Sequence, residues 1–123
     1  MVAFNAFGLI GVIDELLNNS IKIIPLHDVK IKVPARNSRT LENLIIVGTG
    51  KSKTFKIEEF KKNGDIKEGD EIISSGLGGR FPEGFLLGRV TTIEENDQSN
   101  FLLVTVKNAF DFSFGSTILF TKP

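Results

Sequence analysis

"EIISSGLGGRFPEGFLLGRV", residues 71–90, joins two apolar strand-like runs through a glycine-rich loop, Ser74–Gly84. Glycine gives the backbone access to positive φ, which other side chains disfavour, and Pro82 fixes φ at one position of the loop. Gly88 lies inside the second run, where glycine often marks a β-bulge or a barrel corner. The stretch therefore predicts a wide, shaped β-turn that presents Phe81, and not a loop that holds a catalytic nucleophile.

Further strand-like runs extend in both directions from this loop, separated by glycine, proline and polar turns. The expected strands are residues 8–13, 20–24, 29–33, 44–47, 54–57, 71–73, 85–93, 101–106 and 117–120. The run Leu44–Val47 is continuous and apolar, which is typical of a strand buried on both faces. Pro25 and Pro34 are expected to end two runs, because proline cannot donate to a β-ladder. Many short strands with glycine turns are typical of all-β barrels and sandwiches.

The composition of the chain shifts within Lys61–Asp70, where turn-forming residues gather. We therefore expect two small β-barrel modules of short antiparallel strands, residues 1–66 and 67–123, and the second carries the Ser74–Gly84 loop. The first module would be incomplete if its opening strands precede residue 1. The 123 residues are enough for one compact domain or two very small ones.

Charge is balanced over the whole chain but not along it. With 15 basic and 15 acidic side chains, no overall charge favours nucleic acid or acidic lipid. Residues 1–67 hold eleven basic and seven acidic side chains, a net of +4, and residues 68–123 hold four and eight, a net of −4. Such opposed halves favour head-to-tail contacts, although solvated charge also varies along any chain.

Membrane-spanning and export signals are not evident in the sequence. The most apolar N-terminal stretch, Val2–Ile13, is interrupted by polar and glycine residues and is too short to cross a bilayer. It also lacks the basic lead-in of a secretion signal. An anchor or signal, if the native protein has one, is therefore expected outside these residues.

A serine hydrolase built on two barrels is one alternative function. Ser74 and Ser75 precede glycines, as a nucleophile often does. The chain's one histidine, His27, is followed directly by Asp28, and neighbours in an extended strand point to opposite faces, so Asp28 is badly placed to orient the imidazole. The chain also has no cysteine, which excludes disulfides, thiol chemistry and cysteine-bound zinc. We expect no catalytic residue, no metal site and no cofactor.

"VGTGKS", residues 47–52, ends like a phosphate-binding P-loop and follows an apolar strand. The P-loop motif needs glycine where this chain has Ile45, and it needs a helix directly afterwards. The next residues, "KTFKI", do not predict a helix. The stretch therefore predicts a turn between two strands.

A nucleic-acid-binding barrel is the second alternative function. Lysines interleave with Phe55 and Phe60, as in barrels that hold a single strand by charge and base stacking. These lysines are Lys51, Lys53, Lys56, Lys61, Lys62 and Lys67. Glu58, Glu59 and Asp65 dilute their charge, so we expect no nucleic-acid partner.

Residues 65–93 closely resemble the signature of the MreC family of bacterial rod-shape proteins. The matching motifs are Gly69-Asp70, Ser74-Ser75-Gly76-Leu77-Gly78-Gly79, Phe81-Pro82-x-Gly84 and Gly88-Arg89-Val90. "GLIGVI" at residues 8–13 resembles the family's opening strand, and "VGTG" at 47–50 resembles its mid-domain turn. "FLLVTVKNAFDFS" at 101–113 resembles its closing strand and the Asp segment that follows. The resemblance therefore covers nearly the whole chain.

The resemblance implies a periplasmic, all-β region of two small barrels, anchored to the inner membrane by a helix and coiled coil that are missing here. It implies a non-catalytic scaffold of the cell-elongation machinery that controls rod shape by binding peptidoglycan-synthesis partners. The implied partners are the elongation penicillin-binding transpeptidase, MreD and the MreB system. Self-association into homo-oligomers is implied as well.

The motif loop is our candidate for partner contact, with Leu77 and Phe81 as its exposed apolar side chains. Packing that stabilises the turn is the alternative role for both. The candidate residues are Gly76, Leu77, Gly78, Gly79, Arg80, Phe81, Pro82, Gly84 and Gly88.

Overall fold

The computed structural model describes residues 2–5, 8–16, 21–51, 53–109 and 119–120, and all the regular elements in them are β-strands. The predicted all-β class is therefore confirmed. The strands are β1 (Val2–Asn5), β2 (Gly8–Leu16), β3 (Ile21–Pro25), β4 (Lys32–Asn37), β5 (Asn43–Gly48), β6 (Thr54–Ile57), β7 (Phe60–Lys61), β8 (Glu71–Ser74), β9 (Leu86–Glu94), β10 (Phe101–Asn108) and β11 (Leu119–Phe120). Within the described residues, no helix has the length and apolar character needed to cross a membrane.

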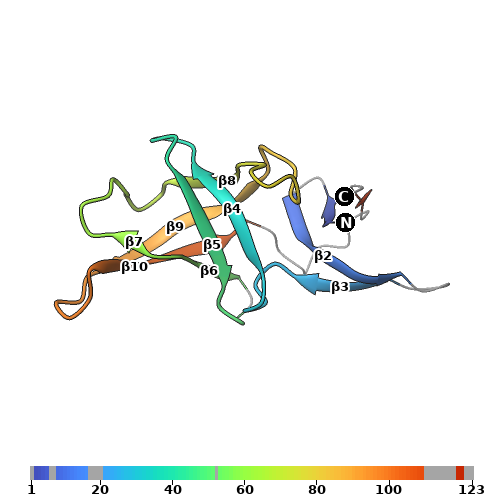
Figure 1. The fold of residues 1–123 in the computed structure, drawn as a ribbon, viewed down its shortest axis with the longest axis horizontal. Helices are drawn as coiled ribbons and strands as arrows, with labels where there is room; N and C mark the ends of the chain where they lie inside the picture. Colours follow the sequence, from blue (N-terminus) through green and yellow to red (C-terminus); the bar gives the residue numbers. More distant parts are fainter. Residues whose placement is uncertain (1, 6–7, 17–20, 52, 110–118, 121–123) are drawn as a thin grey trace.

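Six of the strands close into an antiparallel barrel, which occupies the left of Figure 1. The strand order is β6-β5-β4-β8-β9-β10, and β6 pairs with β10 to complete the ring. The short strand β7 adds to the far end of β10. Closure pairs the backbone groups of β6 and β10, which would otherwise be exposed sheet edges.

Apolar side chains that alternate along each strand fill the barrel. In β6, Phe55 and Ile57 are buried, whereas Lys56 between them is exposed. Burial of one such side chain stabilises the fold by about 1.5–3 kcal/mol. The largest fully buried apolar side chains of the barrel strands are Val33, Ile46, Phe55, Ile72, Leu87, Val90, Val104 and Val106.

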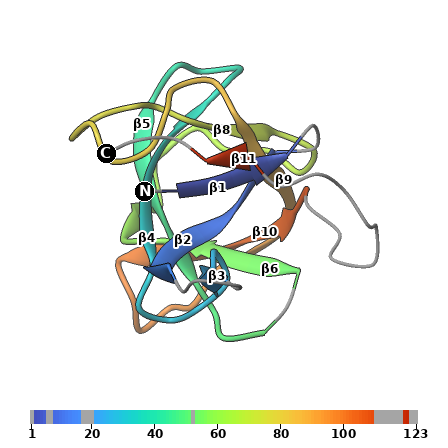
Figure 2. The same cartoon turned by 90° about the vertical axis from the view of Figure 1, so that its right-hand side faces the viewer.

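A second sheet of four strands, in the order β11-β1-β2-β3, lies at the right of Figure 1 and at the front of Figure 2. Its strand β2 lies against β9 of the barrel. Val12 of β2 and Leu26, directly after β3, belong to the same buried cluster as the barrel core. The second sheet therefore shares one hydrophobic core with the barrel.

The expected division between residues 66 and 67 does not separate the two sheets. Strands β4, β5 and β6 come from the first part and β8, β9 and β10 from the second, yet they pair within one barrel. The four-stranded sheet also joins β1–β3 to β11. Turn-rich composition at Lys61–Asp70 marks the connection from β7 to β8, and such a signal does not reveal which strands on either side pair.

Pro34 lies inside β4, whereas the sequence predicts that it ends a strand. Its carbonyl accepts the Ser75 N–H at 3.1 Å, so its nitrogen also faces the side on which β8 lies. The pairing of β4 with β8 begins only one residue later, at Ala35 and Ser74. The missing N–H therefore falls where no ladder bond is needed, and the strand continues.

Gly88 lies where β9 is bulged and closely approached by β10, as the sequence predicted. The β8–β9 register shifts between Ile72, opposite Gly88, and Ile73, opposite Leu86. A Cβ at position 88 would lie 2.1 Å from the backbone oxygen of Lys107. Only glycine allows the two backbones to approach this closely.

We expect Gly88→Ala to lower the free energy of unfolding by about 2–3 kcal/mol, because the new methyl group must push β10 away. Urea denaturation followed by circular dichroism measures the loss. Thr92→Ala, at an exposed position of the same strand, is the control and should change stability by less than about 0.5 kcal/mol. Equal stability of the two variants would contradict the close approach.

Candidate functional site

Ser74 holds together the two ends of the Ser74–Gly84 loop. Its backbone N–H donates to the Phe85 carbonyl at 2.8 Å, and its carbonyl accepts the Gly84 N–H at 2.9 Å. Its hydroxyl donates to the Pro82 carbonyl at 2.6 Å and accepts the Phe85 N–H at 2.9 Å. The loop is therefore closed at its base by four hydrogen bonds to one residue.

The serine-hydrolase alternative requires a reachable hydroxyl, and Ser74 does not have one. Its side chain is fully buried, and Ser75 is only 5% exposed, with its hydroxyl accepting the Leu77 N–H at 3.3 Å. His27 and Asp28 lie in the β3–β4 turn, where the Asp28 carboxylate accepts the Lys30 N–H at 2.9 Å. Ser74 is thus a structural residue of the loop, and the interpretation of Ser74 as a nucleophile is wrong.

The loop glycines have the backbone conformation that the sequence predicted for them. The φ angles are 75° at Gly76, 79° at Gly78, 73° at Gly79 and 92° at Gly84, all in the region that other residues disfavour. The Gly79 N–H donates to the Gly76 carbonyl at 3.1 Å and forms a tight turn. A Cβ on Gly76 would lie 2.9 Å from the Cβ of Glu83, so glycine also lets the two arms of the loop approach.

Phe81 is not an exposed contact residue, and this part of the prediction is wrong. It is 2% exposed and belongs to the barrel core, with the Arg80 guanidinium 5.5 Å from the centre of its ring. The hydrogen bond from Ser74 to the Pro82 carbonyl pulls the loop back over the barrel, which turns the neighbouring Phe81 inward. Its role is the alternative one, packing that stabilises the turn.

Leu77 remains exposed at the tip of the loop, beside an apolar hollow. The side chain is 51% exposed. The hollow has a volume of about 570 Å³ and extends from Leu77 and Gly78 across Pro34, Leu44 and Ile45 to Glu58 and Glu59. We call it the Leu77 groove.

Ile45 forms the opposite side of this groove and was missed in the sequence. The run Leu44–Val47 predicted a strand buried on both faces, but Ile45 is 41% exposed while Ile46 is fully buried. In a single-layered barrel the outward face of a strand meets solvent, so a continuous apolar run leaves one apolar side chain outside. Such a run in a strand of a small barrel is the signal that would have found Ile45.

The P-loop-like stretch and the aromatic residues of the nucleic-acid alternative have structural roles. Residues 47–51 lead out of β5 into the turn before β6, which confirms the predicted turn in place of a P-loop, and Ser52 lies outside the described residues. Phe55 is fully buried and Phe60 is 5% exposed. Neither ring is available to stack on a base, so the aromatic part of the nucleic-acid alternative is wrong.

Asp70 is the buried centre of a polar network whose outer members, Arg39 and Asp65, are exposed. Its carboxylate accepts hydrogen bonds from Asn37 Nδ2 at 2.9 Å, Arg39 Nε at 2.8 Å and the Lys67 N–H at 2.9 Å. Arg39 also donates to Asp65 at 2.8 Å. The network fastens the β4–β5 hairpin to the connection before β8, and thus supports the strand that leads into the loop.

The same contacts shift the protonation of these groups. Hydrogen bonds from Arg39, the largest effect, together with those from Asn37 and Lys67, hold the pKa of Asp70 well below its usual range, although burial opposes them. The hydrogen bond from Arg39 also lowers the pKa of Asp65, and both carboxylates raise the pKa of Arg39. The network is therefore fully ionised at neutral pH.

Known proteins resemble this chain in sequence and in fold. A family model described as "Rod shape-determining protein MreC, barrel core" matches residues 1–121. The "Cell shape-determining protein MreC" of Haemophilus influenzae is 31% identical over 100 residues, which make up 81% of this chain and 28% of that protein. The chain therefore spans little more than a quarter of the length of this relative.

Two solved structures have the same fold. MreC from Pseudomonas aeruginosa superposes with a TM-score of 0.88 at 27% identity, over 95% of this chain and 76% of that one. A chain in the complex between penicillin-binding protein PBP2 and MreC from Helicobacter pylori superposes with a TM-score of 0.69, over 89% of this chain and 67% of that one. At 21% identity this second likeness shows the fold alone.

We expect Phe81→Ala to destabilise the fold by about 3–5 kcal/mol, because it removes a buried ring from the core. Leu77→Ala should change the free energy of unfolding by less than about 0.5 kcal/mol, because its side chain faces solvent. Urea denaturation of both variants tests the pair. A stable Phe81→Ala protein would show that the ring does not belong to the core.

The lowered pKa of Asp70 predicts a loss of stability in acid. The unfolded chain takes up this proton near the ordinary value of about 3.9, whereas the folded state resists it, so the unfolded state binds more protons as the pH falls. The stabilisation is present above the unfolded pKa and decreases as the pH falls from about 5 toward the folded pKa.

Asp70→Asn should reduce stability at neutral pH by about 1–3 kcal/mol and make it less dependent on pH below about 5. Urea midpoints measured across the acid range provide the test. Glu68→Gln, which changes an exposed carboxylate of the same connection, should retain the wild-type profile. If the Asp70→Asn profile were as steep as that of the wild type, the network would not be the source of the acid sensitivity.

Proposed function

Because the chain belongs to the family of the rod shape-determining protein MreC, we propose that it is a non-catalytic scaffold module of the bacterial cell-elongation machinery. In this role it controls rod shape by binding proteins of peptidoglycan synthesis. The match of the family model to residues 1–121 and the cell-shape role in the name of the H. influenzae relative support the proposal.

The observation that carries a binding role is the way the motif loop is built. Its serine and its buried phenylalanine are used to fix the loop on the barrel, and Leu77 is left exposed on this fixed support. A rigidly held apolar side chain loses little conformational entropy when a partner covers it. Apolar side chains gathered at a hollow are also typical of protein interaction sites.

The first partner we propose is the elongation penicillin-binding transpeptidase. The solved complex of PBP2 with MreC from H. pylori, which contains a chain of this fold, supports that choice. The contact we propose on this chain is the Leu77 groove, with Leu77 and Ile45 as its apolar sides. The glycines Gly76, Gly78, Gly79 and Gly84 serve the contact by giving the loop its shape.

The proposal has further parts that rest on family membership. They are a periplasmic location, an inner-membrane anchor outside these residues, contacts with MreD and the MreB system, and self-association. In such an assembly the barrel would serve as a rigid connector between partners.

The test is a binding titration of residues 1–123 against the periplasmic region of the elongation transpeptidase from the same organism. We expect saturable binding, and we expect Leu77→Asp to raise the dissociation constant at least about tenfold, because it places a charge in an apolar contact. Melting curves confirm that the variant is folded.

Leu41→Asp is the matched control, because Leu41 is 68% exposed in the β4–β5 hairpin and does not line the Leu77 groove. It should bind like the wild type. Binding that survives Leu77→Asp would move the contact away from the motif loop. A folded wild type that does not bind would remove the transpeptidase from the partners of these residues.

A further inference from the structure

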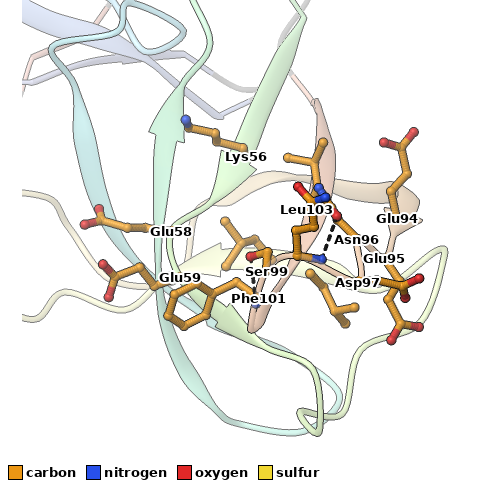
Figure 3. A pocket seen from close by; sticks show the side chains of 13 residues that line it. Lys56, Glu58, Glu59, Glu94, Glu95, Asn96, Asp97, Ser99, Phe101 and Leu103 are labelled. Carbon is orange, nitrogen blue, oxygen red and sulfur yellow. Dashed lines mark hydrogen bonds between the residues drawn. The ribbon is translucent and has the colours of Figure 1, made fainter.

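A second hollow combines apolar side chains with a surplus of carboxylates. It lies between the Glu58–Glu59 turn and the β9–β10 hairpin loop at Glu94–Asp97, over the outward side chains Phe101 and Leu103 of β10, and its volume is about 900 Å³ (Figure 3). We call it the acidic groove. It has no part in the motif loop or in the Asp70 network.

The apolar side chains of this groove face outward from the barrel. Phe101 is 39% exposed and Leu103 is 49% exposed, whereas Val104 is fully buried in the core. Further along β10, Thr105 and Lys107 occupy the outward positions, as expected for a strand with one face in solvent. Two large apolar side chains at such positions indicate a surface that another molecule covers.

The charged side chains around the groove indicate the charge of the molecule that covers it. Glu58 and Glu59 lie on one side of Phe101 and Leu103, and Glu94, Glu95 and Asp97 lie on the other (Figure 3). Two of these carboxylates are paired. Lys32 Nζ lies 3.1 Å from Glu58 Oε2, and Lys62 Nζ lies 3.7 Å from Glu95 Oε1. Among the described residues, Glu59, Glu94 and Asp97 have no ion-pair partner, and Lys56 is the cation that lines the groove. The occupant should therefore be basic and carry an apolar side chain.

A surface with that chemistry is present on the same chain. The turn Asp28–Lys30 lies against the turn before β6, since the Gly50 N–H donates to the His27 carbonyl at 2.7 Å. A Cβ on Gly50 would lie 3.2 Å from Val29, which confirms the contact. Val29 is 60% exposed, and the two turns also carry three exposed lysines. We call Val29, Lys30, Lys51 and Lys53 the basic knob.

The two surfaces are complementary in charge and in polarity. The knob has three lysines without an ion-pair partner among the described residues, and the groove has three such carboxylates. The Asp28 carboxylate, the acidic group of the knob, already accepts the Lys30 N–H at 2.9 Å. Each surface also exposes apolar side chains, Val29 in one and Phe101 with Leu103 in the other.

The fold prevents a chain from filling its own groove. Lys53 directly precedes β6 and Glu58 directly follows it, so the two surfaces lie at opposite ends of this strand. The five residue steps from Lys53 to Glu58 span about 16 Å of extended chain. Both turns are fixed by the barrel, so only a knob from another molecule fits the groove.

We propose that the acidic groove binds the basic knob of a second copy of this chain. The inference rests on the self-association that forms part of the proposed function, and it assigns that association to two named surfaces. The contact is between different surfaces, so each copy keeps one free groove or one free knob when two copies join through it. The charged rim makes the association dependent on salt.

The test is sedimentation velocity on residues 1–123, at about 0.05 M and about 0.5 M NaCl. We expect concentration-dependent association that is weaker at high salt. A groove variant, Glu94→Lys with Asp97→Lys, and a knob variant, Lys51→Glu with Lys53→Glu, should each raise the dissociation constant at least about tenfold. Mixed in equal amounts, the two variants should associate again, because the reversed groove now meets a reversed knob.

Leu103→Ser should also weaken association, whereas Leu41→Ser, at an exposed position outside both surfaces, should not. Failure of the mixture to associate would overturn the pairing of groove with knob. If each variant alone associated as strongly as the wild type, the assignment of the contact to these two surfaces would be overturned. The proposed self-association would not be contradicted. A monomeric wild type at both salt concentrations would overturn both.

The transpeptidase titration tests transpeptidase binding separately from self-association. Glu94 and Asp97 do not line the Leu77 groove, so the groove variant should bind the transpeptidase like the wild type. Loss of that binding in the groove variant would identify the transpeptidase as the occupant of the acidic groove. It would overturn the proposal that a second copy occupies it.

Discussion

The pairing of β6 with β10 is the interaction on which the rest of the structure depends. It joins Phe55 to Val106 and Lys56 to Thr105 across the last gap of the sheet, and thereby turns an open sheet into a closed barrel. Closure encloses Phe55 completely and leaves Lys56 on the outside. It also brings the Glu58–Glu59 turn to the side of β10, so the acidic groove exists only because these two strands, far apart in sequence, are neighbours.

The motif loop illustrates how a closed barrel can carry a long loop without losing its rigidity. Ser74 forms hydrogen bonds to the other end of the loop with its backbone N–H, its carbonyl and its hydroxyl, and Phe81 adds a ring to the core. The strand before the loop is supported in turn by Asp70, which joins the hairpin after β4 to the start of β8. A loop fixed at these three points would lose less conformational entropy when a partner covers Leu77.

The sequence predicted most of the strands, the glycine turns and the family, because these depend on local spacing or on an extended motif. It missed β1, and it placed a strand at residues 29–33, where the structure has a turn through Lys30 and β4 begins at Lys32. It did not predict which strands pair: the turn-rich Lys61–Asp70 segment resembled a boundary, although β6 before it and β10 after it form one ladder. The exposure of Phe81 and Ile45 was also misjudged. Phe81 is buried through a hydrogen bond between Ser74 and Pro82 that spacing does not reveal, and Ile45 is exposed because a barrel wall is one strand thick. The sequence predicted the exposure of Leu77, but not that of Ile45 on the opposite side of the groove.

The two proposed contact surfaces are not independent, since Glu58 and Glu59 line both hollows. Glu59 itself has a φ of 48°, an uncommon value for a residue with a side chain, so the barrel fixes this turn at some cost in strain. A cation that neutralises Glu59 from the acidic groove changes the charge that a partner meets in the Leu77 groove, and the reverse holds to the same extent, because coupling between two sites is reciprocal. In the proposed assembly, binding of a second copy and binding of the transpeptidase would be linked through this turn only when both partners are bound. Glu94 and Asp97 line the acidic groove alone, so their exchange leaves the shared turn, and transpeptidase binding to a single copy, unchanged.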